Sequence, residues 1–250
     1  MASLAGKVPI GTGASRGIGR AIALRLSQEG ASVVINYARG AEQAKDVVSA
    51  IEAAGGKAWA AQADVSKTEE IRDLFDRTLE TYSQVDILVN NAGVILYKPV
   101  GEVTEAEFDN LFAINVKGTF FAGQEAAKRM AEGGRIVNFS SSTTAIMMPT
   151  YGAYVATKGA VEQLTRSLAK ELGDRQIQLM WFLRAQRIQN SSLLAKPPNK
   201  YKDLVKWLLW EDSEKLKILP TWRLFCAANK PGGLPDKIFA LTAGLPKYIL

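Results

Sequence analysis

The chain has 250 residues, enough to bury one sizeable core, and we expect a single domain. It contains no histidine and one cysteine, Cys226, which excludes a histidine base, most zinc sites and an intrachain disulfide, so we expect no metal site. The start of the chain lacks the apolar core of a signal peptide, and no segment approaches the roughly 18 apolar residues of a membrane span. We therefore expect a cytoplasmic protein without membrane contact.

The net charge of +6 is distributed unevenly along the chain. Residues 1–174 carry 18 basic and 20 acidic side chains, whereas residues 175–250 carry 13 basic and 5 acidic ones. A basic segment can bind phosphates, but this one lacks a recognisable nucleic-acid motif. We therefore expect no nucleic-acid partner.

In chain order, short apolar runs alternate with amphipathic helical patterns as far as about residue 174. The runs predict strands buried on both faces, at residues 8–12, 32–37, 57–61, 85–89 and 135–140. The helical patterns span residues 17–29, 41–54, 68–82, 104–131 and 152–173. Repeated strand–helix units predict an α/β fold of the Rossmann type, a doubly wound parallel sheet with helices on both faces. Such sheets bind ligands outside the carboxyl ends of their strands.

The loop after the first predicted strand is rich in glycine and leads directly into a predicted helix. Glycines there let the backbone turn tightly and approach a pyrophosphate, whose charge meets free N–H groups at the helix N-terminus. A glycine pattern alone often marks an ordinary turn, but the strand before it and the helix after it favour a dinucleotide site. The residues that we expect to bind the cofactor are Gly13, Ser15, Arg16, Gly17, Ile18 and Gly19.

The second predicted strand ends in Asn36-Tyr37-Ala38-Arg39. An NAD site usually has an acidic residue here, which holds the ribose hydroxyls. Without that carboxylate, Arg39 and Arg16 could reach a 2′-phosphate, so we expect NADP(H) to be preferred over NAD(H), with Asn36, Tyr37 and Arg39 at the site. The alternative is that both arginines are solvated surface charges.

Two further strand ends carry residues of the expected cofactor site. Asp64 and Val65 follow the third strand, and the Asp64 carboxylate could accept a hydrogen bond from the adenine amino group. Asn91, Ala92 and Gly93 follow the fourth strand, where small residues and an amide would let the backbone pass beneath the cofactor. Either group alone would be an ordinary loop.

Tyr154 and Lys158 lie four residues apart in a helical pattern, so we expect them on the same helix face, one turn apart. A phenol with a pKa near ~10 is a poor proton donor at neutral pH, but a neighbouring ammonium favours the phenolate and lowers that pKa. The pair is therefore a candidate acid–base catalyst, although the same spacing also occurs by chance on exposed helices.

Ser141 follows the fifth predicted strand and could hold a carbonyl oxygen beside the tyrosine hydroxyl, a role for which Ser140 and Ser142 compete on chemistry alone. Asn115 is a polar residue within an apolar helical stripe. It is either a satisfied core amide or the anchor of a water molecule that relays protons to the lysine.

Taken together, these residues resemble the short-chain dehydrogenase/reductase family over roughly residues 5–177. The family's motifs are matched at Thr12–Gly19, Asn90–Gly93, Asn115, Ser141, Tyr154 and Lys158. The resemblance implies that Tyr154 donates the proton, Ser141 positions the carbonyl, Lys158 lowers the tyrosine pKa and binds the nicotinamide ribose, and Asn115 holds the relay water. It is strongest to NADPH-dependent 3-oxoacyl-(acyl-carrier-protein) reductases, which implies a homotetramer or homodimer.

Two regions depart from the family pattern. In the first strand, Pro9 removes a hydrogen-bond donor and Gly11 replaces a branched apolar residue, which suggests a weakened strand or a sequence error. From about residue 178 the family's next strand, Pro-Gly turn, substrate lid and last strand are not legible. A reading-frame shift restores family-like segments from Leu179–Ala185 and Pro235–Gly244, so we hypothesise that much of 178–250 is translated out of frame.

The sequence thus favours an NAD(P)H-dependent oxidoreductase that reduces a ketone or a 3-oxoacyl thioester to the alcohol, with tyrosine as the proton donor. One alternative is an alcohol or sugar dehydrogenase of the same family, working in the opposite direction. Another is a nucleotide-binding pseudoenzyme with a defective carboxyl-terminal part.

Overall fold

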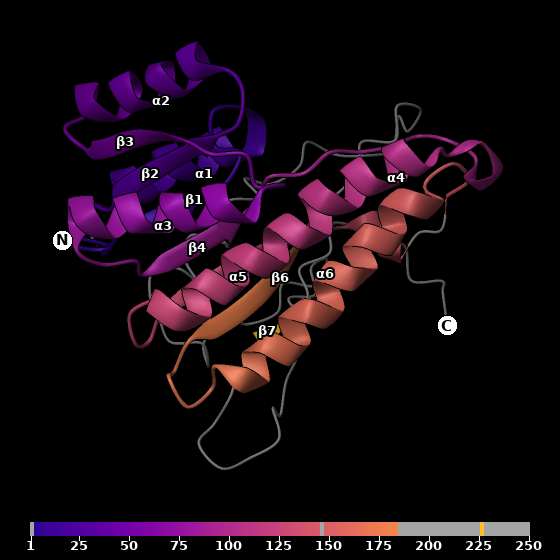
Figure 1. Cartoon of the computed structure of the whole chain (residues 1–250). Coiled ribbons are helices and arrows are strands. Elements are labelled where there is room, and N and C mark those ends of the chain that lie inside the picture. The colour runs from indigo at the N-terminus through magenta and orange to yellow at the C-terminus, as the bar shows by residue number, and fades with distance from the viewer. Residues whose placement is uncertain (1–2, 146–147, 185–225, 228–250) are drawn as a thin grey trace, which may run out of the picture.

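The computed structural model describes residues 3–145, 148–184 and 226–227 (Figure 1). The first half contains β1 (Pro9–Gly11), α1 (Gly17–Gln28), β2 (Ser32–Tyr37), α2 (Ala41–Ala53), β3 (Lys57–Gln62), α3 (Thr68–Tyr82) and β4 (Ile87–Asn90). Then follow η1 (Val100–Glu102), α4 (Glu105–Phe112), η2 (Ala113–Lys117), α5 (Gly118–Arg129), β5 (Arg135–Ser141), η3 (Ser142–Thr144), α6 (Gly152–Glu171), β6 (Gln178–Arg184) and β7 (Cys226–Ala227).

The strands form one sheet in the order β3-β2-β1-β4-β5-β6-β7. Strands β1 to β6 are parallel to their neighbours, and the two-residue β7 is antiparallel to β6. The chain moves outward from β1 to β3 and then returns to place β4 on the other side of β1. This reversal is the topological switch point at which doubly wound sheets bind ligands. The predicted α/β fold is confirmed.

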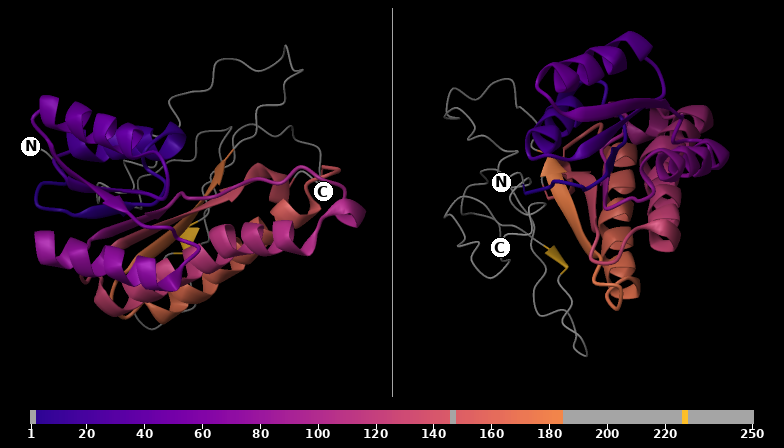
Figure 2. Two further views of the ribbon diagram at one scale, coloured as in Figure 1. Left: turned by 45° about the horizontal axis from the view of Figure 1, so that its top comes forward. Right: turned by 90° about the vertical axis from the view of Figure 1, so that its left-hand side faces the viewer.

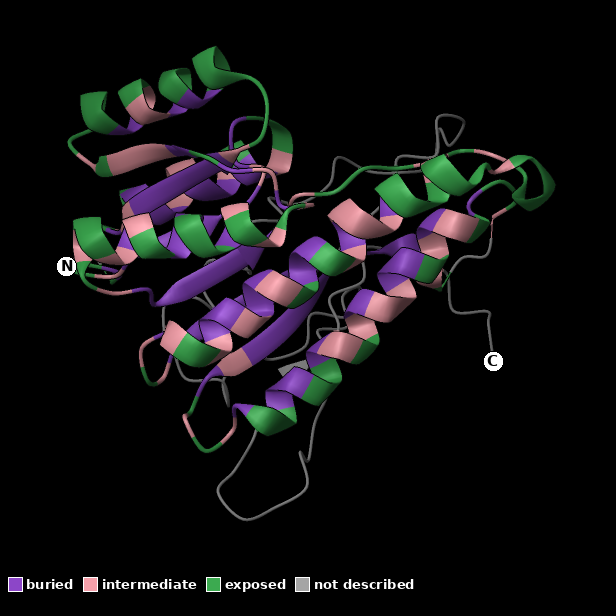
Figure 3. Cartoon of the chain, viewed as in Figure 1, coloured by how far each residue is buried: buried purple, intermediate pink, exposed green. Residues whose placement is uncertain are grey.

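Successive residues of the strands point to opposite faces of the sheet, so β2, β4, β5 and β6 each contribute to two apolar clusters. One cluster packs against α1 and α2 and includes Ile35, Val89 and Val137. The other packs against α3, α5 and α6 and includes Val34, Leu88 and Ile136. The right-hand view of Figure 2 shows α5 and α6 beside one face of the sheet, and Figure 3 shows that the central strands are buried, while the edge strand β3 is partly exposed and the outer helix faces are exposed. In the described part of the chain, no helix is long and apolar enough to cross a bilayer.

β1 is shorter than the predicted strand 8–12, and Pro9 supplies a physical reason. The N–H of Ser32 donates to the Lys7 carbonyl (2.9 Å), whereas the N–H of Thr12 donates to Val89 in β4 (2.9 Å). Because ladder bonds alternate between the two neighbours of a strand, the N–H of residue 9 would face β2 and donate to Ser32. Proline has no N–H, so this central ladder lacks one donor.

The predicted helix 104–131 is interrupted. Its first part, α4, begins with a capping box in which Thr104 and Glu107 exchange hydrogen bonds. The π-helical segment η2 then separates α4 from α5. Periodicity does not distinguish a π-turn from a continuous helix, because the apolar stripe runs on through both. Single π-turns are frequent at functional sites, and η2 carries Asn115.

The strand that is not legible in the sequence after residue 178 is present, because β6 pairs with β5 along seven residues. A parallel strand buried on both faces requires little more than a short apolar run. Leu179 lies in the cluster beside α6, and Met180 and Phe182 lie in the cluster on the opposite face. The family-type Pro-Gly turn, lid and last strand fall outside the described residues, and the reading-frame hypothesis stays a prediction.

Candidate active site

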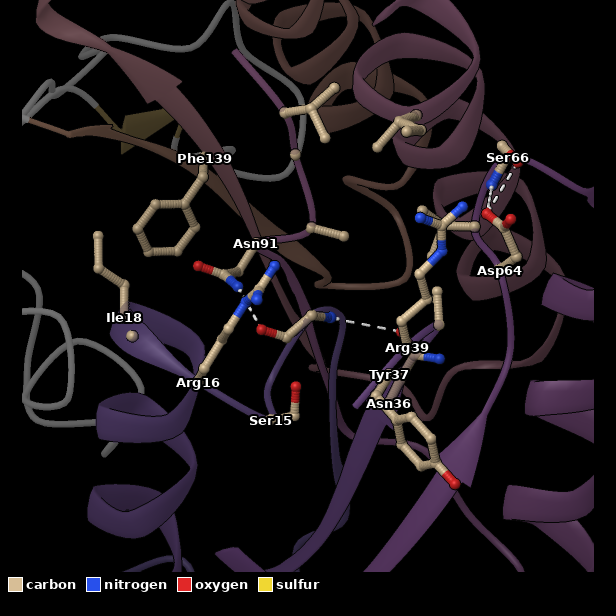
Figure 4. A pocket seen from close by; sticks show the side chains of 18 of the residues that line it. Ser15, Arg16, Ile18, Asn36, Tyr37, Arg39, Asp64, Ser66, Asn91 and Phe139 are labelled. Atoms are coloured by element: carbon tan, nitrogen blue, oxygen red, sulfur yellow. Dashed lines mark hydrogen bonds between the residues drawn. The ribbon is translucent and has the colours of Figure 1, made fainter. Parts of the chain in front are cut away.

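A cavity of about 580 Å³ opens at the carboxyl ends of strands β1 to β5, beside the switch point (Figure 4). Its size lies within the ordinary range for cofactor and small-molecule sites. Fifteen of the predicted site residues line it: Gly13, Ser15, Arg16, Gly17, Ile18, Asn36, Tyr37, Arg39, Asp64, Val65, Asn91, Ala92, Gly93, Tyr154 and Lys158. Gly19, Asn115 and Ser141 are not among its lining residues.

The glycine-rich loop between β1 and α1 forms the floor of this cavity. Gly13 and Gly17 adopt left-handed backbone conformations, with φ of +60° and +56°. A Cβ atom on Gly19 would lie 2.5 Å from the Gly13 carbonyl oxygen and 2.6 Å from Asn91 Nδ2. Gly19 therefore acts from beneath the cavity, where it lets the loop pack closely on the start of α1.

The floor is tied to β4 by side chains from both sides of the switch point. Thr12 Oγ1 accepts hydrogen bonds from the N–H groups of Asn91 (3.1 Å) and Ala92 (3.0 Å). In return, Asn91 Nδ2 donates to the carbonyls of Thr12 and Gly13, both at 3.0 Å. These four bonds fix the loop after β1 relative to the loop after β4.

Asn36 has a structural role in addition to its place in the wall. Its side-chain Nδ2 donates to the carbonyls of Ala61 (3.3 Å) and Ala63 (2.9 Å), and its Oδ1 accepts from the Gly13 N–H (3.4 Å). The residue is buried, so its amide holds the ends of β2 and β3 and the glycine loop together.

The two arginines are both exposed and do not converge. Figure 4 shows Arg16 beside Asn91, while Arg39 extends toward Asp64. Their positions leave open both of the predicted roles, phosphate ligand and solvated surface charge.

Ser66 is a wall residue that the sequence analysis missed. Asp64 Oδ1 accepts from the Ser66 N–H (2.9 Å) and Oγ (2.8 Å). Burial raises the pKa of Asp64, but these bonds, together with the charges of Lys67 and Arg39, outweigh it and lower the pKa below its ordinary value. Asp64 is therefore an anionic acceptor at the rim, and an Asp two residues before a Ser is a recognisable turn signal.

Tyr154 and Lys158 lie one turn apart on α6, as predicted, and both face the cavity while 5% exposed. The Lys158 Nζ is 5.7 Å from the centre of the Tyr154 ring and donates a hydrogen bond to the Phe139 carbonyl (2.8 Å) at the end of β5. The Lys158 ammonium is thus fixed between the strand and the tyrosine. A cation in this place stabilises a phenolate.

The three consecutive serines have different surroundings. Ser140 lines the cavity, and its Oγ donates to Glu162 Oε1 on α6 (2.6 Å). Ser141 is 2% exposed, and its Oγ accepts from the N–H (3.3 Å) and Oγ1 (2.9 Å) of Thr143. Ser142 begins the short η3 helix.

Asn115 is a satisfied core amide, which was one of its two predicted roles. Its Oδ1 accepts from the Val94 N–H (2.8 Å), and its Nδ2 donates to the Val94 carbonyl (2.9 Å) and to Thr157 Oγ1 (3.1 Å). Its own carbonyl accepts from Thr119 Oγ1 (2.9 Å). The amide therefore fixes the chain just beyond Gly93 to the catalytic helix, and its water-relay role stays a prediction.

The remaining lining residues were not predicted. Asn110 and Ile114 are four apart, on consecutive turns of the α4–η2 segment, so helical spacing could have paired them. Phe139 and Ser140 end β5, and Val94 and Ile95 follow Gly93. Among the residues that the structure describes, no cluster of three or more potential metal ligands occurs.

Comparison with known proteins identifies several relatives. Elsinochrome reductase 1 of Elsinoe fawcettii is 47% identical over 175 residues, which are 70% of this chain and 66% of that protein. The landomycin C-6 ketoreductase LanV, solved with NADP and rabelomycin, is 41% identical with a TM-score of 0.70, covering 72% of this chain and 76% of that one. A short chain dehydrogenase of Burkholderia cenocepacia in complex with NADP is 32% identical with a TM-score of 0.75, covering 86% and 95%.

The sequence profile of the short chain dehydrogenases matches residues 7–183. This range contains the glycine-rich loop, the five strand ends that line the cavity, and the helix with Tyr154 and Lys158. It ends within β6, close to the limit at residue 177 that the motifs indicated. The chain belongs to the short-chain dehydrogenase family and is an oxidoreductase.

Proposed function

We propose that the protein is an NADPH-dependent reductase that converts a ketone or a 3-oxoacyl thioester into the corresponding alcohol. The observation that carries the proposal is that Tyr154 and Lys158 line the same cavity as the glycine-rich loop. A proton donor and a dinucleotide cradle are therefore within one enclosed site. The relatives support ketone reduction, since one is named a ketoreductase and another an elsinochrome reductase.

The residues present fit a nicotinamide dinucleotide. The loop of Gly13 and Gly17 is open toward the cavity at the N-terminus of α1, where backbone N–H groups and the helix dipole favour a pyrophosphate. Asp64 would hold the adenine end, and Lys158 the nicotinamide ribose. When bound, the nicotinamide would supply the hydride that reduces the carbonyl carbon.

Side chains of the protein would donate the proton and bind the carbonyl oxygen of the substrate. Tyr154 would donate its hydroxyl proton to the carbonyl oxygen, and the Lys158 ammonium would stabilise the phenolate that remains. Ser141 would hold the carbonyl oxygen through a hydrogen bond. A negative charge that develops on this oxygen meets donors already in place, which is the largest contribution in many enzymes.

NADP(H) is the proposed cofactor because no carboxylate ends β2 and two arginines reach the cavity. Arg39 and Arg16 are exposed to solvent, and both could form charge-assisted hydrogen bonds with a 2′-phosphate bound near Tyr37. Two of the solved relatives hold NADP, which supports this choice.

The proposal is tested with a panel of ketones and acetoacetyl thioesters in the presence of NADPH, measured by loss of its absorbance. We expect turnover by the wild type and a loss of more than about 100-fold in Tyr154→Phe, because general acid catalysis contributes on this scale. NADPH binding, followed by its fluorescence, should change little. Binding without turnover of any substrate would instead indicate a pseudoenzyme, and faster alcohol oxidation with NADP⁺ would indicate a dehydrogenase.

The proposal includes a small-molecule substrate and self-assembly as a homotetramer or homodimer. Light scattering of the purified protein would measure its mass directly. A monomer at micromolar concentration would contradict the assembly but leave the proposed chemistry intact.

A further inference from the structure

Ser141 has an unusual hydrogen-bond balance. A serine hydroxyl has one proton to donate and two lone pairs that accept. Both neighbours of Ser141 Oγ come from one residue, because the Thr143 N–H donates to it (3.3 Å) and the Thr143 hydroxyl lies 2.9 Å away, where either hydroxyl can donate to the other. Among the described residues, the acceptor within reach of the Ser141 proton is Thr143 Oγ1.

The direction of these bonds determines where the serine proton points. An amide N–H can only donate, so at least one lone pair of Ser141 must face Thr143. When the threonine hydroxyl also donates, the serine proton is directed away from η3. Ser141 is 2% exposed, so a ligand oxygen that takes over its proton leaves a lone pair that needs a donor, and the Thr143 hydroxyl is in place to supply one.

We propose that Thr143 is a positioning residue that fixes Ser141 as a hydrogen-bond donor toward the substrate carbonyl. This inference rests on the proposed function, in which Ser141 holds the carbonyl oxygen. The threonine touches neither substrate nor cofactor. It acts by donating to Ser141 Oγ when the carbonyl oxygen accepts the serine proton, which favours the donor orientation of the serine hydroxyl.

The backbone of Ser141 is held separately from its hydroxyl. Thr144 Oγ1 lies 2.9 Å from the Ser141 carbonyl and 2.8 Å from Glu162 Oε1, and Ser140 Oγ donates to the same carboxylate. The end of β5 is therefore anchored to α6 without Thr143. Removal of the Thr143 hydroxyl should change the orientation of the serine proton and leave the backbone in place.

The test compares Thr143→Val, which keeps the shape of the side chain but removes the hydroxyl, with Thr143→Ser, which restores the hydroxyl. Thr78→Val is the matched control, because Thr78 is equally buried and its hydroxyl donates to the Leu74 carbonyl on α3, away from the cavity. Two properties are measured: kcat/KM for a ketone of the panel, and the Kd of that ketone for the enzyme saturated with NADP⁺, by calorimetry.

We expect Thr143→Val to weaken ketone binding and to lower kcat/KM by about 3- to 10-fold, the effect of one neutral hydrogen bond. NADPH binding should be unchanged, Thr143→Ser should recover at least half of the loss on a logarithmic scale, and Thr78→Val should match the wild type in both properties. A Thr143→Val enzyme equal to the wild type in ketone binding and in kcat/KM would overturn the inference.

A double-mutant cycle separates positioning from a general structural effect. In a Ser141→Ala background the threonine hydroxyl has nothing to orient, so Thr143→Val should cause no further loss. The same loss in both backgrounds would overturn the inference. A wild type that binds ketones without reducing them would refute the proposed reductase, and ketone Kd values would still decide the role of Thr143. A wild type that neither binds nor reduces any ketone would refute both.

Discussion

The two ends of the cavity are built differently. At the catalytic end, Tyr154, Lys158 and Asn115 are at most 5% exposed, and Asn115 and Lys158 are fixed by hydrogen bonds to the chain. At the phosphate end, Arg16 and Arg39 are exposed and point to different neighbours (Figure 4). The folded chain alone fixes the proposed reacting groups, whereas Arg16 and Arg39 would have to change their orientation to contact a bound 2′-phosphate together.

We expect the largest effects on NADPH affinity and stability from substitutions in the glycine-rich loop, which forms the floor between the two ends. Gly19→Ala would place a methyl group 2.5 Å from the Gly13 carbonyl, so the loop must shift. We expect the NADPH Kd to rise by more than about tenfold and the free energy of unfolding to fall by about 1–3 kcal/mol, as for other overpacked sites. Fluorescence titration and urea denaturation measure the two effects.

Gly159→Ala in α6 is the control for this substitution, because a Cβ there meets nothing within 4 Å. It should be neutral or stabilising by up to about 1 kcal/mol, since alanine favours a helix. If Gly19→Ala behaved in the same way, the close packing of the floor would not be required for cofactor binding.

At the phosphate end, Arg39→Ala should weaken the binding of NADPH but not that of NADH. One lost charge-assisted hydrogen bond corresponds to about tenfold in affinity for NADPH, whereas NADH, which lacks the 2′-phosphate, should bind as before. The exposed Arg20 on α1 does not line the cavity, so Arg20→Ala is the matched control for the lost charge. Equal losses for NADPH and NADH would contradict a phosphate-binding role.

The missing donor in β1 predicts a stabilising substitution beneath the floor. Pro9→Ala would restore a hydrogen bond to Ser32, worth about 0.5–1.5 kcal/mol. The greater freedom of the unfolded chain offsets about 0.4–1 kcal/mol of this gain. We expect a net gain of at most about 1 kcal/mol in urea denaturation, and a loss of stability would show that the strand has adapted to proline.

The smallest effect is expected at Glu107, which does not line the cavity. Hydrogen bonds from Lys98 and from the N–H and hydroxyl of Thr104 lower its pKa to about 2. Because the folded pKa lies below the unfolded one, the contribution is full above about pH 4.5 and disappears as the pH falls through about 2. Glu107→Gln should lower the Tm by no more than about 2 °C at pH 6. The difference in Tm between the wild type and Glu107→Gln should vanish near pH 2. A difference that persisted at this pH would show that the effect does not come from the negative charge of Glu107.

Much of the fold could be predicted because buried parallel strands are marked by apolar runs. The predicted and observed strands coincide at 32–37, and the repeated strand–helix units predicted a parallel sheet with helices on both faces. The interruption at η2 could not be predicted, since the apolar stripe continues through it. β6 was missed although the sequence does mark it. The apolar run Leu179–Phe182 is typical of a buried strand, but the residues from 178 onward do not match the family pattern, and no strand was assigned to them.

For the site, spacing on regular helices and strands was sufficient to predict which residues lie close together on these elements. Tyr154 and Lys158 share a face because helical geometry requires it, and the strand ends meet because the sheet is parallel. The hydrogen-bond partners of Asn36 and Ser141 could not be foreseen, because they come from loops whose conformation the residue types do not determine. The orientation of exposed arginine side chains is equally undetermined by sequence.

The most direct measurement uses NADPH carrying deuterium at the transferable position, with a ketone reduced by the wild type. The account predicts an alcohol with one deuterium on the former carbonyl carbon, and loss of this product by more than about 100-fold in Tyr154→Phe at saturating cofactor. An alcohol without deuterium, or an undiminished rate in Tyr154→Phe, would contradict it.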